Sequence, residues 1–383
     1  MIKLSILSFL LMIILSCKFQ TKNASLENDW ALIPFQKADS LNPIFSADTS
    51  LKFNCPIAQT NIKWAEKDVF NPAATLRNDT VFLLFRAEDV VGQYNGTSRV
   101  GLAWSTDGYH FTSYPSPVLY PDNDEYKSIE WEGGCEDPRI TESEVGTYIL
   151  TYTSYDGTTA RLMIASSTDL MNWKKHGPAF TGSLNDKYSN IWNKSGSIVS
   201  DYRSGKPVAK KINGKYWMYW GDQNIWAATS DDLIKWTPVH YEAGDTPFED
   251  PRGIAKELTD LKTVLGPRKK KFDSDLIEPG PPAMYTDNGI VLIYNSRNIP
   301  EIGDKELAEG TYAAGQVLLD KNDPLKVLAR LDDYFMKPEK DYEIAGQVNQ
   351  VCFLEGLVKY KGRWFVYYGT ADSKIAVATS SAK

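Results

Sequence analysis

Two adjacent carboxylates in the segment WEGGCEDPRI, residues 131–140, are the strongest candidates for chemistry in this sequence. Two glycines precede them, and glycine lets a backbone approach a ligand closely. The proline that follows fixes a turn, and Arg139 can hold a carboxylate or sugar hydroxyls through two hydrogen bonds. A carboxylic acid whose pKa is raised in such a place can serve as a general acid. Glu136 and Asp137 are near-equal candidates by these arguments, and a salt-bridged structural turn is the alternative.

A second copy of the motif, FEDPR at residues 248–252, provides an internal comparison. This copy lies in a polar, charged and proline-rich stretch from Glu242 to Lys271, which we interpret as a loop insertion. Neither a glycine pair nor a predicted strand precedes it. We therefore expect Asp250 to be a structural or surface residue.

Composition argues against several other kinds of site. The three histidines lie far apart in the chain, which disfavours a histidine-based metal centre and a Ser-His-Asp triad. The cysteines after Cys17 are odd in number and widely spaced, so neither a disulfide framework nor a zinc site is indicated. A net charge of −7 disfavours nucleic acid, whose phosphates call for basic clusters. We expect no metal, no organic cofactor and no nucleic-acid partner.

Repeats define the elements that must position these residues. The segments AWSTDGYHF, ASSTDLMNW and AATSDDLIKW, which start at residues 103, 165 and 227, share a small-residue strand, a Ser/Thr-Asp turn and a closing aromatic residue. A β-rich run precedes each one, and two further strand pairs follow within residues 289–320 and 364–380. Repeated small sheets are typical of a β-propeller. We predict an all-β fold, a five-bladed β-propeller, with a long β-sandwich or a β-helix as the alternative.

The first 17 residues predict export. One lysine is followed by an apolar run from Ile6 to Leu15 and then by Ser16 and Cys17. The run is too short to span a bilayer comfortably, which takes about 20 residues, and a small residue before the cysteine fits a cleavage site. The segment resembles a bacterial lipoprotein signal, which implies that Cys17 carries a lipid. An ordinary signal peptide or an uncleaved anchor is the alternative.

We therefore divide the chain into a signal peptide (residues 1–17), a short tether (18–30) and one catalytic domain (31–383). The expected location is extracytoplasmic, with the chain lipid-anchored to the outer membrane. The periplasmic face is favoured because the residues directly after Cys17 are not acidic. Only the N-terminal lipid would contact the membrane.

Several motifs in order resemble glycoside hydrolase family 130, the β-mannoside phosphorylases and β-mannosidases, over nearly the whole mature chain. They are VFNPAATLRNDTVFLLFRAED, GGCEDPRI, ARLMIASSTDLMNW, KINGKYWMYWGD, IEPGPPAMYTDNGIVLIYN and FLEGLVKYKGRWFVYYGTADSKIAVA. The resemblance implies a five-bladed propeller that acts on a β-mannoside oligosaccharide or mannan fragment. It also implies that Asp137 is the proton donor and that Asn71, Arg86, Arg139 and Asp372 line the mannose site.

The family contains both phosphorolysis and hydrolysis, and charge should distinguish the two. Where its phosphorylases usually carry a GGGPPP-like segment, this chain has IEPGPP with Glu278, and Asn295 stands where a YHG-like segment has its histidine. Asp222 lies near the expected position of an arginine. A carboxylate beside a phosphate dianion in a poorly screened cleft would be repelled by roughly several kcal/mol. Hydrolysis is therefore the better interpretation.

Two basic residues favour the alternative function, that of a phosphorylase that releases mannose 1-phosphate. Similar motifs in phosphorylases include basic residues at the anion site, and Arg161 and Lys194 are the candidates here. Structural alternatives also exist for the acids. Glu278 could be a charge partner of Arg268 or Lys271, and Asp222 could be a turn residue.

For hydrolysis we expect a single-displacement, inverting mechanism. Asp137 would protonate the leaving oxygen, directly or through a sugar hydroxyl, while Glu278 would activate water with help from Asp222. Glu136 would contact the substrate. Because the carboxyl groups of an inverting pair stand about 6.5–9.5 Å apart, Asp137 and Glu278 should face one pocket.

Two other classes of protein differ from a mannoside-cleaving enzyme in the residues that they need. A non-catalytic mannan-binding surface lipoprotein needs aromatic platforms and hydrogen bonds but no proton donor, so the set of carboxylates favours the enzyme. The related propeller arabinosidases and xylosidases use three separated acids and lack the GGCEDPR context. We therefore expect a glycosidase.

Overall fold

The structure, a computed structural model, describes residues 28–94, 96–252 and 260–381, and its secondary structure is almost entirely β. Within these residues the α-helices are two single turns, α1 (Lys127–Glu130) and α2 (Asp341–Ile344). The predicted all-β class is confirmed. The predicted signal peptide with Cys17, and most of the tether, lie outside the described residues. No helix in the described part of the chain is long and apolar enough to cross a membrane.

Antiparallel units of consecutive strands follow one another along the chain. The first two are β4 (Asp68–Arg77), β5 (Thr80–Glu88), β6 (Ser98–Ser105) and β7 (Thr112–Ser113), and then β8 (Gly134–Glu142), β9 (Tyr148–Tyr155), β10 (Ala160–Ser167) and β11 (Lys174–Pro178). The third contains β12 (Ser197–Ile198), β15 (Lys211–Ile212), β16 (Lys215–Trp220), β17 (Ile225–Ser230) and β18 (Thr237–Pro238). The fourth contains β20 (Leu276–Pro279), β21 (Met284–Tyr285), β22 (Ile290–Arg297), β23 (Tyr312–Leu319) and β24 (Val327–Arg330). The last contains β25 (Cys352–Tyr360), β26 (Arg363–Thr370) and β27 (Lys374–Ser380).

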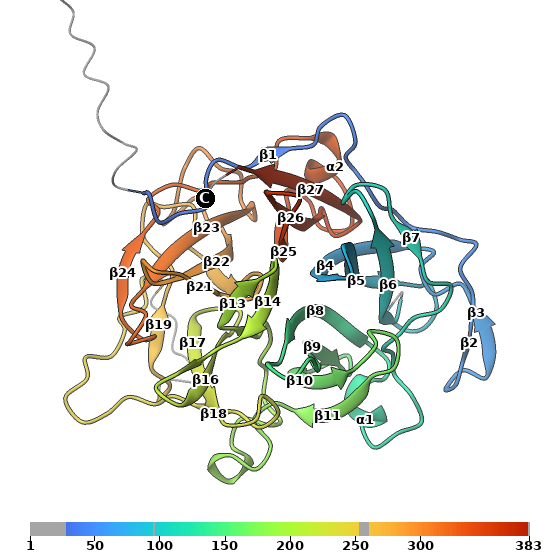
Figure 1. The fold of residues 1–383 in the computed structure, drawn as a ribbon, viewed down its shortest axis with the longest axis horizontal. Coiled ribbons are helices and arrows are strands. Elements are labelled where there is room, and N and C mark those ends of the chain that lie inside the picture. The colour runs from blue at the N-terminus through green and yellow to red at the C-terminus, as the bar shows by residue number, and fades with distance from the viewer. Residues whose placement is uncertain (1–27, 95, 253–259, 382–383) are drawn as a thin grey trace, which may run out of the picture.

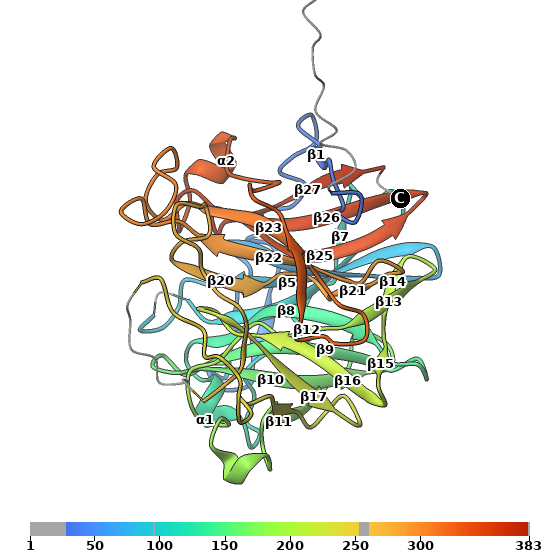
Figure 2. The same cartoon turned by 90° about the vertical axis from the view of Figure 1, so that its left-hand side faces the viewer.

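The first strand in the described residues completes the last sheet. Strand β1 (Gln36–Lys37) pairs with β27 in an antiparallel register that joins Gln36 to Thr379. Figure 2 shows β1 beside β27, near the point where the described chain ends. This pairing joins the beginning of the described chain to its last strand. Outside the units, β2 (Phe53–Cys55) and β3 (Thr60–Ile62) form a separate hairpin.

The units are arranged around a common centre, as Figure 1 shows. Strand β4 packs against both β8 and β25, so the first strands of these units meet. The hairpin of β13 (Ser200–Arg203) and β14 (Lys206–Ala209) joins β8 to β21 through isolated parallel pairs. Residues at the first strands, although far apart in the sequence, can therefore share one site.

The repeated Ser/Thr-Asp turns have the same hydrogen bonds in three units. In each turn the serine Oγ accepts a backbone N–H three residues later, and the aspartate Oδ1 accepts the next backbone N–H groups. The serine and aspartate pairs are Ser105 and Asp107, Ser167 and Asp169, and Ser230 and Asp232. These turns link β6 to β7, β10 to β11 and β17 to β18, so the sequence repeat corresponds to a repeated structural unit.

The interpretation of residues 242–271 as a loop insertion holds for most of the described part. One exception is β19 (Thr263–Leu265), which pairs with β17 and extends the third sheet. Buried Val264 and Leu265 pack into the core between the third and fourth units. These apolar side chains explain why this piece of a polar segment forms a strand.

Candidate active site

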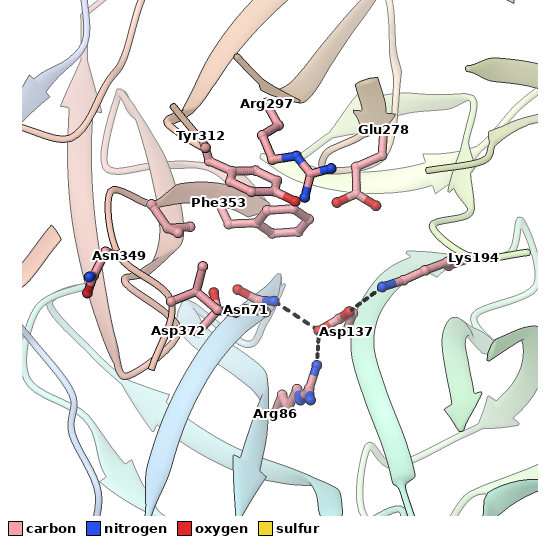
Figure 3. A pocket seen from close by; sticks show the side chains of 13 residues that line it. Asn71, Arg86, Asp137, Lys194, Glu278, Arg297, Tyr312, Asn349, Phe353 and Asp372 are labelled. Atoms are coloured by element: carbon pink, nitrogen blue, oxygen red, sulfur yellow. Dashed lines mark hydrogen bonds and ion pairs between the residues drawn. The ribbon is translucent and has the colours of Figure 1, made fainter. Parts of the chain in front are cut away.

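A cavity of about 340 Å³ opens where the first strands of the units converge. Its lining is mostly polar and comes from β4, β5, β8, β20, β22, β23, β25 and the loops beside them (Figure 3). The lining residues are Asn71, Arg86, Asp137, Lys194, Glu278, Arg297, Gly310, Tyr312, Val348, Asn349, Val351, Phe353 and Asp372. The structure thus brings together six of the residues predicted from the sequence, namely Asn71, Arg86, Asp137, Lys194, Glu278 and Asp372.

Unusual backbone geometry aims the polar side chains into the cavity. Asn71, Asp137 and Asp372 have φ angles of 48°, 47° and 50°, in the left-handed region that non-glycine residues rarely adopt. The strand pairing shifts register at Asn71 in β4 and again at Asp137 in β8, so each lies at a β-bulge. Bulges re-aim side chains and are frequent next to active sites. Backbone strain of this kind is typical of functional positions.

A short sequence pattern that the sequence analysis did not use marks two of these positions, Asn71 and Asp137. In the first strand of each unit, or just before it, a polar residue is followed by proline or glycine. The residues are Asn71, Asp137, Ser195, Glu278 and Glu355. The pattern would have added Ser195 and Glu355 to the candidates. It has a physical basis because proline and glycine are the residues that tolerate bulges in strands.

Asp137 lies among three hydrogen-bonding or cationic groups. Asn71 Nδ2 donates to its Oδ1 at 2.9 Å, Arg86 Nη1 lies 3.2 Å from the same oxygen, and Lys194 Nζ lies 3.9 Å from Oδ2 (Figure 3). Burial by itself would raise the pKa of Asp137, but Arg86 and Lys194 lower it to about 2. In the free protein this residue is therefore a carboxylate at neutral pH.

Glu136, the second candidate in the motif, does not line the cavity. Its Oε1 lies 3.0 Å from Arg86 Nη2 and accepts a hydrogen bond from Ser98 Oγ at 3.4 Å. Burial raises the pKa of Glu136 to about 7, with Arg86 opposing the shift and Asp137 adding to it. Sequence arguments could not separate these two acids. The structure distinguishes them because the Asp137 side chain lines the cavity and the Glu136 side chain does not.

Glu278 is the other acid of the predicted pair, and it lines the same cavity as Asp137. Ser195 Oγ donates a hydrogen bond to its Oε2 at 2.8 Å. Burial raises the pKa of Glu278 to about 7, and the ammonium of Lys194 opposes this shift. Arg268 and Lys271, its partners in the structural alternative, form ion pairs with other aspartates. Glu278 is therefore free to face the cavity.

Arg139, which the family resemblance placed at the mannose site, is buried outside the cavity lining. It donates hydrogen bonds to the main-chain oxygens of Asp137 at 3.1 Å, Pro279 at 2.8 Å and Gly280 at 3.0 Å. Its Nη2 also lies 2.9 Å from Oε1 of buried Glu355. Arg139 therefore links the strands that carry the two candidate catalytic acids, β8 and β20.

Two other predicted residues also lie outside the cavity lining. Asp222 accepts a hydrogen bond from the indole Nε1 of Trp192 at 2.6 Å. Arg161 Nη1 pairs with Asp156 at 2.7 Å and also donates to the main-chain oxygen of Thr159. Asp222 can still act on the cavity through its charge, because it contributes to the raised pKa of Glu278. The Arg161 guanidinium is held by Asp156 and Thr159, residues close to it in the sequence.

Asn295 has a structural contact. Its side-chain amide donates a hydrogen bond to Leu354 O at 3.0 Å and accepts one from Leu354 N at 2.8 Å, which joins β22 to β25.

The duplicated motif lies away from the cavity, as we expected from its sequence context. Asp250 lies outside the cavity lining, and its carboxylate is 2.7 Å from Arg252. The second EDPR copy therefore pairs internally, whereas the first presents its aspartate to the cavity.

The cavity also contains two aromatic residues that no sequence pattern predicted. Tyr312 and Phe353 form its apolar side, with ring centroids 6.1 Å apart (Figure 3). Burial raises the pKa of Tyr312 to about 12, and that of Asp372 to about 7. Aromatic residues are so frequent in these strands that composition could not single out this pair. In the described part of the chain, no group of three or more His, Cys, Asp and Glu side chains could hold a metal ion.

The model of one sequence family matches nearly the whole chain. It is that of glycoside hydrolase family 130, described as beta-1,4-mannooligosaccharide phosphorylase, and it matches residues 39–383. The chain belongs to glycoside hydrolase family 130. The predicted family is thus confirmed, and the chain is an enzyme of a family that acts on β-mannosides.

Relatives of this family 130 enzyme include phosphorylases and hydrolases. A 1,2-beta-oligomannan phosphorylase of Thermoanaerobacter sp. is 30% identical over 325 residues, 82% of this chain and 90% of the relative. A solved glycosyl hydrolase of Bacteroides ovatus is 46% identical with a TM-score of 0.84, over 92% of this chain and 94% of that chain. Another solved structure, also 46% identical and with the same coverage, has a TM-score of 0.83. It is described as showing that this family of mannoside phosphorylases contains glycoside hydrolases that target β-1,2-mannosidic linkages in Candida mannan.

Proposed function

We propose that this family 130 enzyme is an exo-acting, inverting β-mannosidase with β-1,2-mannosides as its substrates. The observation that carries the proposal is the buried carboxylate of Glu278, which lines the same cavity as Asp137. Water needs a base to become a nucleophile, whereas a phosphate anion would be repelled by that carboxylate. The 46% identity to a structure described in terms of hydrolases of β-1,2-mannosidic linkages supports the same choice.

Glu278 has properties suited to a general base. A catalytic base is most effective when its pKa lies near the working pH, and the pKa of Glu278 is about 7. In the proposed step Glu278 takes a proton from water while the water oxygen bonds to the anomeric carbon. Asp222 supports this role through its charge, which raises the pKa of Glu278.

Asp137 supplies the proton to the leaving oxygen as the glycosidic bond breaks, directly or through a sugar hydroxyl. Because Arg86 and Lys194 hold it as a carboxylate in the free protein, it must gain that proton as the substrate binds. A sugar that fills the cavity displaces water, and loss of solvent favours the neutral acid. After the reaction Glu278 carries one proton more and Asp137 one fewer, and exchange with solvent restores both.

The second candidate function is phosphorolysis, and the cations of the cavity favour it. Lys194 and Arg297 both line the cavity near Glu278, and such groups could bind phosphate. Relatives about 30% identical are named as mannoside phosphorylases. Against this, Arg297 already pairs with Asp275, and Lys194 is attracted by Asp137 and Glu278. These carboxylates neutralise much of the positive charge that a phosphate would need.

One experiment separates the two reactions. The purified protein is incubated with β-1,2-mannobiose in phosphate-free buffer and in buffer with added phosphate, and the products are identified. Hydrolysis predicts free mannose at the same rate in both buffers. Strict dependence on phosphate with mannose 1-phosphate as product would refute the proposal, and no turnover with either would favour a mannan-binding protein.

The architecture and the membrane anchor complete the proposal. We propose that the five antiparallel units are the blades of a five-bladed β-propeller, because their first strands converge on one cavity. Residues 31–383 would form this single catalytic domain, held at the outer membrane by a lipid on Cys17. A Cys17→Ala variant should then be released from the membrane fraction. Retention of that variant in the membrane would contradict the lipid anchor.

A further inference from the structure

We propose that Tyr94, Tyr155 and Trp192 form a binding site for the sugar units on the leaving-group side of the scissile bond. We call these three residues the aromatic strip. The inference rests on the proposed cleavage of β-mannosides, and it names where the rest of the oligosaccharide binds. None of the three residues lines the cavity that holds the candidate catalytic acids.

The three rings form a continuous row at the surface. The ring centroids of Tyr94 and Tyr155 are 6.2 Å apart, and those of Tyr155 and Trp192 are 6.3 Å apart. Tyr94 is 38% exposed and Trp192 is 44% exposed, whereas nearly all other aromatic side chains of the described residues are buried or half-buried. Exposed apolar surface that is contiguous marks a binding surface. Aromatic rings with polar tips suit a ligand that, like a sugar, has apolar faces and hydroxyl edges.

Glycines make room for two of these rings. A Cβ on Gly133 would lie 2.4 Å from the Tyr155 ring, and one on Gly157 would lie 1.9 Å from the Tyr94 hydroxyl oxygen. Tyr155 also donates a hydrogen bond to Gly157 O at 2.9 Å. The glycine that precedes the catalytic motif therefore accommodates an aromatic side chain. Since a larger residue at Gly133 or Gly157 would clash with these rings, the backbone conformation here accommodates both tyrosines.

The third ring is held by a hydrogen bond from its indole. Trp192 Nε1 donates to Asp222 at 2.6 Å, which fixes the plane of a side chain that is otherwise 44% exposed. Asp222 thereby acts as a positioning residue for the strip, in addition to its effect on Glu278. A fixed ring loses less conformational entropy when a ligand binds to it.

The strip adjoins the cavity on the side of the proton donor. Tyr155 pairs with Gly134 in the β8–β9 ladder, three residues before Asp137. Trp192 precedes Lys194 by two residues, and Lys194 Nζ lies 3.9 Å from Asp137. The proton donor must contact the leaving oxygen. A chain of sugars that extends from this oxygen therefore continues towards the strip, whereas the terminal mannose occupies the cavity.

Chain length is the property that this site would control. A mannobiose places one unit beyond the scissile bond, whereas a mannotetraose places three, which is enough to reach across the row of rings. We therefore expect the wild-type enzyme to prefer the tetraose in kcat/KM. Trp192→Ala should lower kcat/KM for β-1,2-mannotetraose roughly tenfold, a loss of about 1.4 kcal/mol. For β-1,2-mannobiose the same change should stay within about threefold.

Two further variants separate the strip from a general structural effect. Trp192→Phe keeps a ring but loses the hydrogen bond to Asp222, so it should retain most of the preference for the tetraose. Met171→Ala is the control for exposure, because Met171 is also 44% exposed but lies in the β10–β11 turn. It should leave both substrates unaffected. All assays are run with and without phosphate, so the test does not depend on which nucleophile is used.

The outcomes distinguish this inference from the function on which it rests. Absence of turnover on any β-mannoside would refute the proposed function. Turnover by the wild type without a preference for the longer substrate would refute the strip alone. An equal loss on both substrates in Trp192→Ala would also refute it. A loss confined to the tetraose, with partial rescue by Trp192→Phe, would support it.

Discussion

Replacing Arg139 with methionine should destabilise the protein in a way that depends on pH. Arg139 and Glu355 are both buried, and the arginine is the cation that faces the Glu355 carboxylate. Among the residues that the structure describes, neither oxygen of Glu355 has another hydrogen-bond partner. Removal of one member of a buried ion pair typically costs about 3–5 kcal/mol, because an uncompensated charge remains. We expect a loss of this size in the free energy of unfolding at neutral pH.

The pH dependence follows from the pKa of Glu355. Burial already raises this pKa well above its ordinary value, and Arg139 opposes the shift. Without the arginine the folded-state pKa rises further above the unfolded value. The stability of Arg139→Met is therefore highest at low pH, where Glu355 is protonated in both states, and is lost as pH rises through the folded pKa. A proton that Glu355 binds in the folded but not in the unfolded state gives a slope of up to about 1.4 kcal/mol per pH unit, and in Arg139→Met this slope extends to higher pH than in the wild type.

Urea unfolding between pH 5 and pH 8 measures this effect in four proteins: the wild type, Arg139→Met, Glu355→Gln and the double variant. The double variant lacks both the arginine and the carboxylate, so no unpaired buried charge remains. It should therefore be more stable than Arg139→Met at pH 8, and its free energy of unfolding should lack the pH dependence that Glu355 causes. The coupling between the two changes should be about 2–3 kcal/mol. Additive changes, or a pH-dependent loss of stability that ends at the same pH in Arg139→Met and in the wild type, would refute the reasoning.

Three further predictions concern the cavity. Asp137→Asn should lower turnover by about 100-fold or more, the usual scale for a general acid, whereas Asp250→Asn in the duplicated motif should stay within a few-fold; equal losses would contradict the assignment. If Glu278 is the base, its carboxylate form is lost as pH falls below its pKa of about 7. The value of kcat/KM should therefore fall on the acid side of pH 7. This acid limb of the pH profile should be absent from the residual activity of Glu278→Gln. Ser195→Ala removes a hydrogen bond that stabilises the Glu278 carboxylate, so the acid limb should move to higher pH, and an unchanged pH profile would show that this contact does not tune the base.

The sequence by itself determined the local structure and the family. The Ser/Thr-Asp turns could be predicted because the side chain that closes each turn bonds to N–H groups two or three residues away. The strands could be predicted because their aromatic and β-branched residues favour extended backbone whatever they pack against. The order of several motifs identified the family, and the glycine pair and predicted strand found only at the first motif separated Asp137 from Asp250.

Only the tertiary structure decided which residues face the cavity. A bulge in β8 directs Asp137 rather than Glu136 into the cavity, and its geometry depends on packing against β4 and β9. Arg139 looked like a ligand for sugar, but it bonds to Pro279 O, 140 residues away in the sequence. Asp222 looked like a helper of the base, but its carboxylate also holds the Trp192 indole. In each case the partner comes from a different part of the chain, and contacts between distant segments exist only once the units have packed around their common centre.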